Sequence, residues 1–186
     1  MNKKIIGLVF VFLCAQLLEL SSQNQSYYFT SSGTVLFNSI GYQETITAKS
    51  EQLKGYLNMN TKAFAFVVRN SSFNGFNSSL QQDHFNENYI ESERFPNTSF
   101  KGKLIDDLDF TATTTCTVRA KGVFSMHGIE QDKIIKVRLT KKNIGIQMES
   151  KFVVLLRDFD ILIPRIIHDK ISPEINIEVN AELLNK

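Results

Sequence analysis

The chain has 186 residues, a formal net charge of +2, fifteen phenylalanines and no tryptophan. This length suits one domain with a sizeable apolar core. A net charge so close to zero gives no extended basic surface for nucleic acid, and we expect no nucleic-acid partner.

The first 22 residues have the form of a secretory signal peptide. Lys3 and Lys4 precede an apolar run over residues 5–18, which small and polar residues follow. The run is short for a membrane-spanning helix, which needs about 20 apolar residues. We therefore predict cleavage at the end of residues 1–22 and a periplasmic or secreted mature domain at residues 23–186.

The cysteines limit the covalent chemistry of this domain. A lipid anchor on Cys14 is the alternative to cleavage, but Leu13 stands before it where a small residue is expected. Cys116 is the one cysteine after residue 22, so no intrachain disulfide can form in the mature domain. We expect Cys116 to be a small apolar core residue.

Apolar and polar residues alternate through most of the remaining chain, as in half-buried antiparallel strands. Gly, Asn and Asp between short runs indicate hairpins. The expected strands, in chain order, are 28–37, 45–49, 53–58, 64–69, 99–104, 112–119, 124–127, 135–139, 143–148, 152–156 and 175–182. We predict one all-β domain that closes into an antiparallel β-barrel, because closure removes exposed strand edges.

Alternation alone does not show which face of the barrel points outward. An eight-stranded outer-membrane barrel has a similar length, with apolar residues toward lipid. This chain ends in ELLNK rather than an aromatic residue, and it has no tryptophan for the interfacial girdles. We therefore expect a barrel that does not span a membrane.

One segment, residues 79–91, has a helical period. Leu80, His84, Phe85 and Tyr89 recur at the spacing of one helix face. Pro96 is expected to end the helix, because the residue before a proline favours extended geometry. A short helix between two barrel strands would cover an open end, which explains these residues without catalysis.

Three segments carry recognisable motifs. The first is SLQQDHFNENYIESERFPNTSFKG, the second is GVFSMHGIEQDKIIKVRL, and the third is SKFVVLLRDFDILIPRIIHDKISPEINIEVNAEL. In this order they resemble the YceI-like, polyisoprenoid-binding family, in the form seen in secreted proteins of Bacteroidetes, over residues 27–184. The resemblance implies a lipocalin-like antiparallel β-barrel of about eight strands, with an apolar cavity for an isoprenoid chain such as a polyprenyl phosphate or a quinone tail.

The chain departs from the family pattern in two places. Many members have Asp-x-x-His-Ser in the first strand, where this chain reads YYFTSSGTVLF, so the ligand's identity is not carried over. Val153 and Leu155 stand where relatives have lysine or similar residues on an outer face. This apolar face predicts a homodimer or protein contact, or else a covering loop or helix.

Residues with catalytic or metal-binding potential do not form complete sets. His84 and Glu87 could share a metal with His127 or His168, but a zinc site needs three or four converging ligands. Ser125 and His127 lie on one strand face without an orienting third group or a Gly-x-Ser-x-Gly turn. We expect no metal, no cofactor and no enzymatic activity.

The predicted ligand site has an apolar wall and a polar mouth. The wall residues, which an ordinary packed core would equally require, are Phe64, Phe66, Val68, Phe100, Phe124, Met126, Phe152, Val154 and Leu156. The expected head-group contacts are His84, Arg94 and Arg157, since arginine matches a phosphate bidentately. We predict a carrier of an amphiphilic isoprenoid lipid; the alternative is a structural or partner-binding barrel whose cavity is closed.

Overall fold

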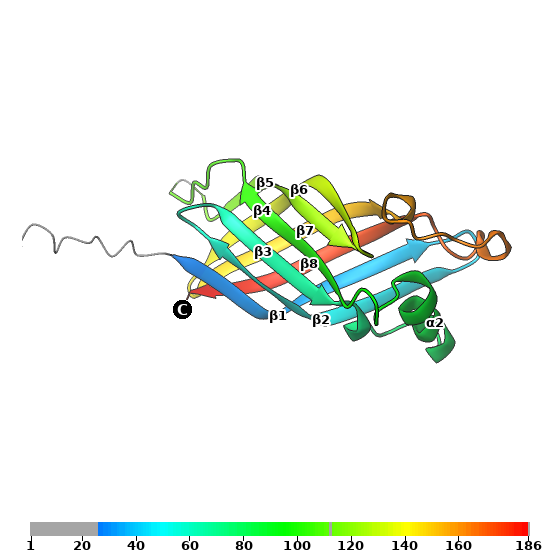
Figure 1. Cartoon of the computed structure of the whole chain (residues 1–186). Helices are drawn as coiled ribbons and strands as arrows, with labels where there is room; N and C mark the ends of the chain where they lie inside the picture. The colour runs from blue at the N-terminus through cyan, green and yellow to red at the C-terminus, as the bar shows by residue number, and fades with distance from the viewer. Residues whose placement is uncertain (1–25, 112, 186) are drawn as a thin grey trace, which may run out of the picture.

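The computed structural model describes residues 26–111 and 113–185, so the expected signal peptide lies outside the described residues. Eight antiparallel strands follow one another around a closed barrel, and the last pairs with the first (Figure 1). The strands are β1 (Tyr27–Ile40), β2 (Thr45–Asn58), β3 (Ala63–Arg69), β4 (Asn97–Leu104), β5 (Thr115–Met126), β6 (Ile129–Lys142), β7 (Gly145–Leu155) and β8 (Glu174–Asn185). The predicted fold class is confirmed.

Three strands each join two runs that the sequence pattern separates. β2 joins the runs expected at 45–49 and 53–58, β5 joins those expected at 112–119 and 124–127, and β7 joins those expected at 143–148 and 152–156. In β2 and β7 a buried serine stands where the apolar pattern is interrupted. The hydroxyls of Ser50 and Ser72 are 2.6 Å apart, and Ser150 donates to the carbonyl of Lys136 at 2.8 Å. These hydrogen bonds satisfy the buried hydroxyls, so the alternation continues through polar residues.

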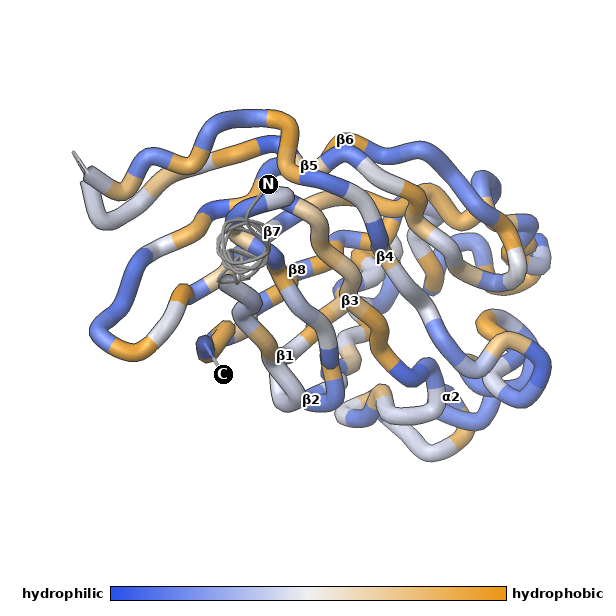
Figure 2. Tube along the Cα trace, turned by 60° about the vertical axis from the view of Figure 1, so that its left-hand side comes forward, coloured by the Kyte–Doolittle hydropathy of each residue, from blue (hydrophilic) through white to orange (hydrophobic). Residues whose placement is uncertain are grey.

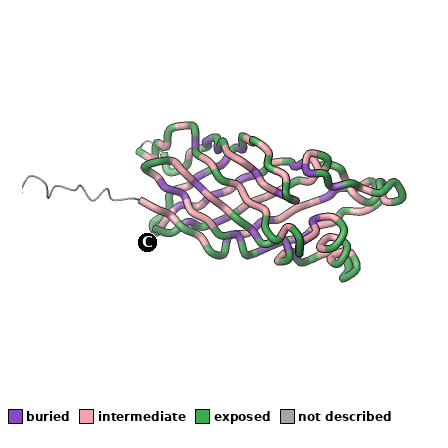
Figure 3. The backbone as a smooth tube through the Cα atoms, viewed as in Figure 1, coloured by how far each residue is buried: buried purple, intermediate pink, exposed green. Residues whose placement is uncertain are grey.

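The apolar face of the alternation points into the barrel. Figure 2 shows hydrophobic and hydrophilic residues alternating along the strands, and Figure 3 shows the matching alternation of burial. In β6, Val137 and Leu139 are buried, whereas Lys136 and Arg138 between them are exposed. The outward charges form exposed ion pairs such as Lys151–Glu178 at 2.9 Å. Among the described residues, no helix is both long and apolar enough to cross a membrane.

The helical segment is shorter than predicted. Helix α2 (Ser79–His84) continues into a π-helical turn, η2 (Phe85–Tyr89). The hydroxyl of Ser78 caps its start by accepting from the backbone N–H of Gln81. Glu91 then takes a left-handed backbone conformation, with φ of 48°. The helix therefore ends before Pro96 is reached, and the prediction that the proline ends it is wrong.

The two ends of the barrel differ in their connections. At the end where β2 meets β3, the turn at residues 59–62 is short. The opposite end, which we call the mouth end, has the connections 41–44, 70–96, 127–128 and 156–173, and α2 lies in the second of these (Figure 1). The connection 70–96 also contains η1 (Asn70–Ser72), and the connection 156–173 contains η4 (Arg165–Ile167) as well as the helix η3 that is described below.

Strands β6 and β7 separate from each other toward the mouth end. β6 pairs with β7 over residues 137–142 and 145–150, and the two strands are not paired beyond that. The short helix η3 (Leu156–Phe159) fills the opening, with Phe159 fully buried. The side-chain amide of Gln131 donates to the Asp158 carbonyl at 3.2 Å and holds η3 against β6.

Candidate ligand cavity

The barrel encloses an apolar cavity of about 610 Å³ that extends toward the mouth end. All eight strands contribute side chains to its wall, and α2 and η2 contribute Leu80, His84 and Phe85 at the mouth. A volume of this order is typical of pockets that enclose most of one small ligand. The closed-cavity alternative requires an interior filled by side chains. The structure instead has an open cavity.

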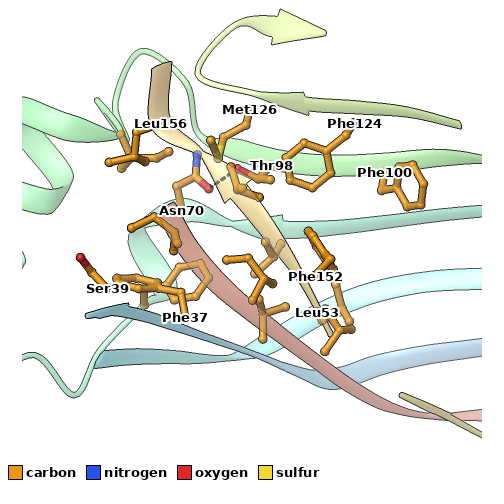
Figure 4. Close-up of a pocket in the computed structure, with 18 of the residues that line it drawn as sticks. Phe37, Ser39, Leu53, Asn70, Thr98, Phe100, Phe124, Met126, Phe152 and Leu156 are labelled. Carbon is orange, nitrogen blue, oxygen red and sulfur yellow. Dashed lines mark hydrogen bonds between the residues drawn. The ribbon is translucent and has the colours of Figure 1, made fainter. Parts of the chain in front are cut away.

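The predicted wall residues share this one cavity. All nine line it: Phe64, Phe66, Val68, Phe100, Phe124, Met126, Phe152, Val154 and Leu156. A chain of ring contacts links the strands, from Phe64 to Phe100 at 4.9 Å, on to Phe124 at 6.2 Å and to Phe152 at 6.0 Å between centroids. Figure 4 shows several of these rings around the same space. The wall thus presents mainly aromatic and aliphatic carbon.

One glycine makes room for a wall residue. Gly55 on β2 stands opposite Phe66 on β3. A Cβ atom at Gly55 would lie 2.3 Å from the Phe66 ring, which is closer than any van der Waals contact. Any side chain at residue 55 would displace the ring, so the sequence places Phe66 by leaving its neighbour without one.

A second aromatic group near the mouth was not predicted as part of the site. The rings of Phe37, Phe73, Phe76 and Phe85 pack together, with Phe37 and Phe85 stacked at 5.4 Å and Phe76 and Phe85 at 5.2 Å. All four line the cavity. Phe37 is the last residue of the expected strand 28–37, so the strand pattern was a signal that could have placed it in the wall. Phe73 and Phe76 lie in a loop without periodicity, so no sequence signal could have placed them.

Inside the cavity, the buried polar groups have protein partners. The buried side chain of Asn70 donates to the Phe95 carbonyl at 2.7 Å and accepts from the Thr98 hydroxyl at 2.8 Å (Figure 4). Within residues 26–111 and 113–185, every buried side-chain nitrogen or oxygen has a hydrogen-bond partner. The deep cavity therefore presents apolar surface, and its buried polar groups are already satisfied by the protein.

The family model for the YceI-like domain matches residues 24–183. The chain belongs to this family. Three solved structures share the fold at low sequence identity. A polyisoprenoid-binding domain from Saccharophagus degradans has a TM-score of 0.72 and 11% identity, covering 88% of this chain and 100% of that one. BcnA from Burkholderia cenocepacia has a TM-score of 0.68 and 8% identity, covering 83% of this chain and 96% of that one.

The third is a mutant YceI protein from Campylobacter jejuni with a monobromobimane guest, at a TM-score of 0.54 and 13% identity, covering 90% of this chain and 88% of that one. A comparison with curated proteins finds no match. At these identities the solved structures show the fold alone.

The mouth of this YceI-like domain differs from the one predicted. His84 lines the cavity, but Arg94 and Arg157 do not. The Arg94 guanidinium lies 4.8 Å from the centre of the Phe95 ring and pairs with Glu91 at 3.3 Å. The exposed Arg157 side chain lies 3.9 Å from Asp158. Local partners hold both arginines on the outer surface, and their role as head-group contacts stays a prediction.

Two charged residues, Glu44 and Lys170, line the cavity together with His84. The side-chain amides of Asn77 and Gln81 donate to Glu44 Oε1 at 2.8 and 2.7 Å. These hydrogen bonds, with the charge of Lys170 as a smaller cause, lower the pKa of the Glu44 carboxyl. The mouth thus carries an ionised carboxylate beside one lysine.

The remaining histidines have local structural partners. His127 lies in the β5–β6 turn with a positive φ of 51°. Its Nδ1 is 2.8 Å from the Phe159 carbonyl, and its Nε2 is 3.3 Å from Glu91 Oε1, which lowers the pKa of Glu91. His168 Nε2 is 2.9 Å from the Ile163 carbonyl. No group of three or more His, Cys, Asp or Glu among the described residues is placed to hold a metal.

The predicted outer contact face is smaller than expected. Val153 on β7 is exposed, but Leu155 is half-buried. Ile134 on β6, across the parting of these strands, is also exposed. The homodimer or partner contact stays a prediction.

Proposed function

We propose that the protein is a non-catalytic carrier of an isoprenoid or similarly slender amphiphilic lipid, acting in the periplasm or after secretion. The cavity carries this proposal: about 610 Å³ enclosed by a barrel and lined almost wholly by carbon. Burial of apolar ligand surface contributes about 25 cal/mol per Å², enough to hold a hydrocarbon chain without polar anchors. Family membership and the polyisoprenoid-binding domain of similar fold support the same ligand class.

The mouth favours a neutral head group over a phosphate. Arg94 and Arg157 are occupied elsewhere, and the Glu44 carboxylate lies among the mouth residues with Lys170. A phosphate there would meet one lysine and a like charge. A hydroxyl or quinone carbonyl would instead find hydroxyl and amide groups, because Ser78 and Gln81 also line the mouth.

The test has two parts. Mass spectrometry of the organic extract from protein purified out of its own host should detect a bound isoprenoid lipid. Delipidated protein should then bind geranylgeraniol at least as tightly as geranylgeranyl phosphate in a displacement assay with a fluorescent apolar probe. Binding of neither compound, with no lipid in the extract, would overturn the carrier. Phosphate binding more than about tenfold tighter, or about 1.4 kcal/mol, would overturn the neutral head group alone.

A further inference from the structure

Large apolar side chains project into solvent around the cavity mouth. Tyr42 is 94% exposed, Leu80 61%, Leu162 81% and Ile166 92%. They come from three connections at the mouth end: Tyr42 lies in the β1–β2 turn, Leu80 in helix α2 between β3 and β4, and the other two in the loop between β7 and β8. We call these four residues the mouth rim.

The three connections are joined to one another and to the cavity. The backbone N–H of Gln43 donates to the Asp169 carbonyl at 2.8 Å, and Gln81 donates to Glu44. Leu162 and Ile166 lie between Ile161 and Ile167, and both of those isoleucines line the cavity. The mouth rim therefore surrounds the opening through which a ligand would pass.

Exposed apolar side chains gathered around an opening mark an interaction surface. Single tips on separate loops suit the soft interface of a bilayer, into which apolar groups insert about 5–10 Å. Tyr42 has the amphipathic ring that is enriched at membrane interfaces. Within residues 161–171, the part of this loop that carries Leu162 and Ile166, Arg165 and Lys170 exceed the single acid Asp169, which suits a surface containing anionic lipid.

We propose that the mouth rim docks on a lipid bilayer, with its apolar side chains inserted among the head groups. The cavity then faces the membrane, and a hydrocarbon chain passes between the two without crossing water. The purpose of this docking rests on the proposed function, but the docking itself is measurable without any cargo.

The absence of tryptophan from the sequence allows a direct test. Ile166→Trp places one fluorophore at the mouth rim, and Ile144→Trp places one on a 76% exposed isoleucine in the turn between β6 and β7, at the other end of the barrel. With vesicles of phosphatidylethanolamine and phosphatidylglycerol, the emission of Ile166→Trp should shift to shorter wavelength while that of Ile144→Trp stays unchanged. Equal shifts in both variants, or none at residue 166, would overturn bilayer docking; in the latter case the mouth rim would serve another partner.

A second measurement removes the apolar contacts. The double variant Leu162→Asp/Ile166→Asp should lower vesicle partitioning by about a hundredfold, since each of the two buried aliphatic side chains contributes about tenfold. Ile144→Asp is the control and should partition like the wild type. Geranylgeraniol binding without vesicles should be unchanged in both variants. Unchanged partitioning of the double variant would overturn the docking, whereas docking without cargo binding would overturn the proposed carrier instead.

Discussion

The two ends of the barrel use similar residues in different ways. At the end away from the mouth, Val118, Ile146 and Leu183 are buried in one apolar cluster and do not line the cavity. At the mouth end β6 and β7 are not paired with each other, and Phe37 and Phe85 line the cavity. The comparison shows that the residues packed beyond the cavity and the residues of its mouth lie at opposite ends of the barrel. The long mouth connections can therefore set ligand preference with little effect on the packed end.

The largest expected effect comes from the packed end. Leu183→Ala removes a fully buried side chain that does not line the cavity and should lower the free energy of unfolding by about 2–5 kcal/mol. Leu80→Ala at the mouth rim is the matched control, and it should change that energy by less than about 0.5 kcal/mol because the side chain is mostly exposed. Urea unfolding measures both. Similar losses in the two variants would show that the ends are equally important for stability.

The next effect concerns the cavity wall. Phe124→Asn puts an amide on the wall, where burying it costs about 1–3 kcal/mol, and should weaken geranylgeraniol binding accordingly. Arg94→Ala should leave the affinity nearly unchanged, since Arg94 does not line the cavity. The comparison requires variants that circular dichroism shows to be equally folded. A loss of binding in Arg94→Ala with intact binding in Phe124→Asn would place recognition outside the barrel.

The sequence predicts the barrel well because side-chain alternation is a direct consequence of strand geometry. It predicts the wall for the same reason, since inward residues of a closed barrel must share one interior. It predicts the mouth only in part, since His84 lines the cavity but Arg94 and Arg157 do not. Arg94 and Phe76 lie in long connections, where contacts distant in sequence decide the conformation and no periodicity reports them. Arg94 looked available for a ligand, but Glu91 and Phe95 engage it.

A smaller effect is expected at the His127 turn, which links the β5–β6 hairpin to η3 and Glu91. His127→Asn keeps a residue that tolerates the positive φ and removes the ring contacts. The free energy of unfolding should fall by about 1–2 kcal/mol, because each lost hydrogen bond costs about 0.5–1.5 kcal/mol. His168→Asn changes an exposed histidine and should cost less in the same unfolding measurement. The reverse order would contradict a fastening role for His127.

The smallest expected effects concern one carboxylate at each end of the barrel, Asp106 away from the mouth and Glu44 at the mouth. Arg119 donates to Asp106 from its side chain and backbone, which lowers the Asp106 pKa from 3.8 to about 2. A carboxyl whose pKa is lower in the folded chain stabilises the fold above its unfolded pKa and loses this effect as the pH falls. The stabilities of Asp106→Asn and the wild type should therefore converge between pH 3.8 and about 2.

Glu44 at the mouth also has a lowered pKa, so its contribution to stability should likewise be lost as the pH falls. The two carboxylates should differ in how added salt changes that contribution. Neutral amides are the main cause of its lowered pKa, whereas a full positive charge acts on Asp106. Salt screens charge pairs on the surface more than it weakens hydrogen bonds from amides. At neutral pH, added salt should narrow the stability difference between Asp106→Asn and the wild type. The stability difference between Glu44→Gln and the wild type should stay nearly constant. Equal narrowing in urea unfolding would mean that Lys170, rather than the two amides, holds the Glu44 carboxylate.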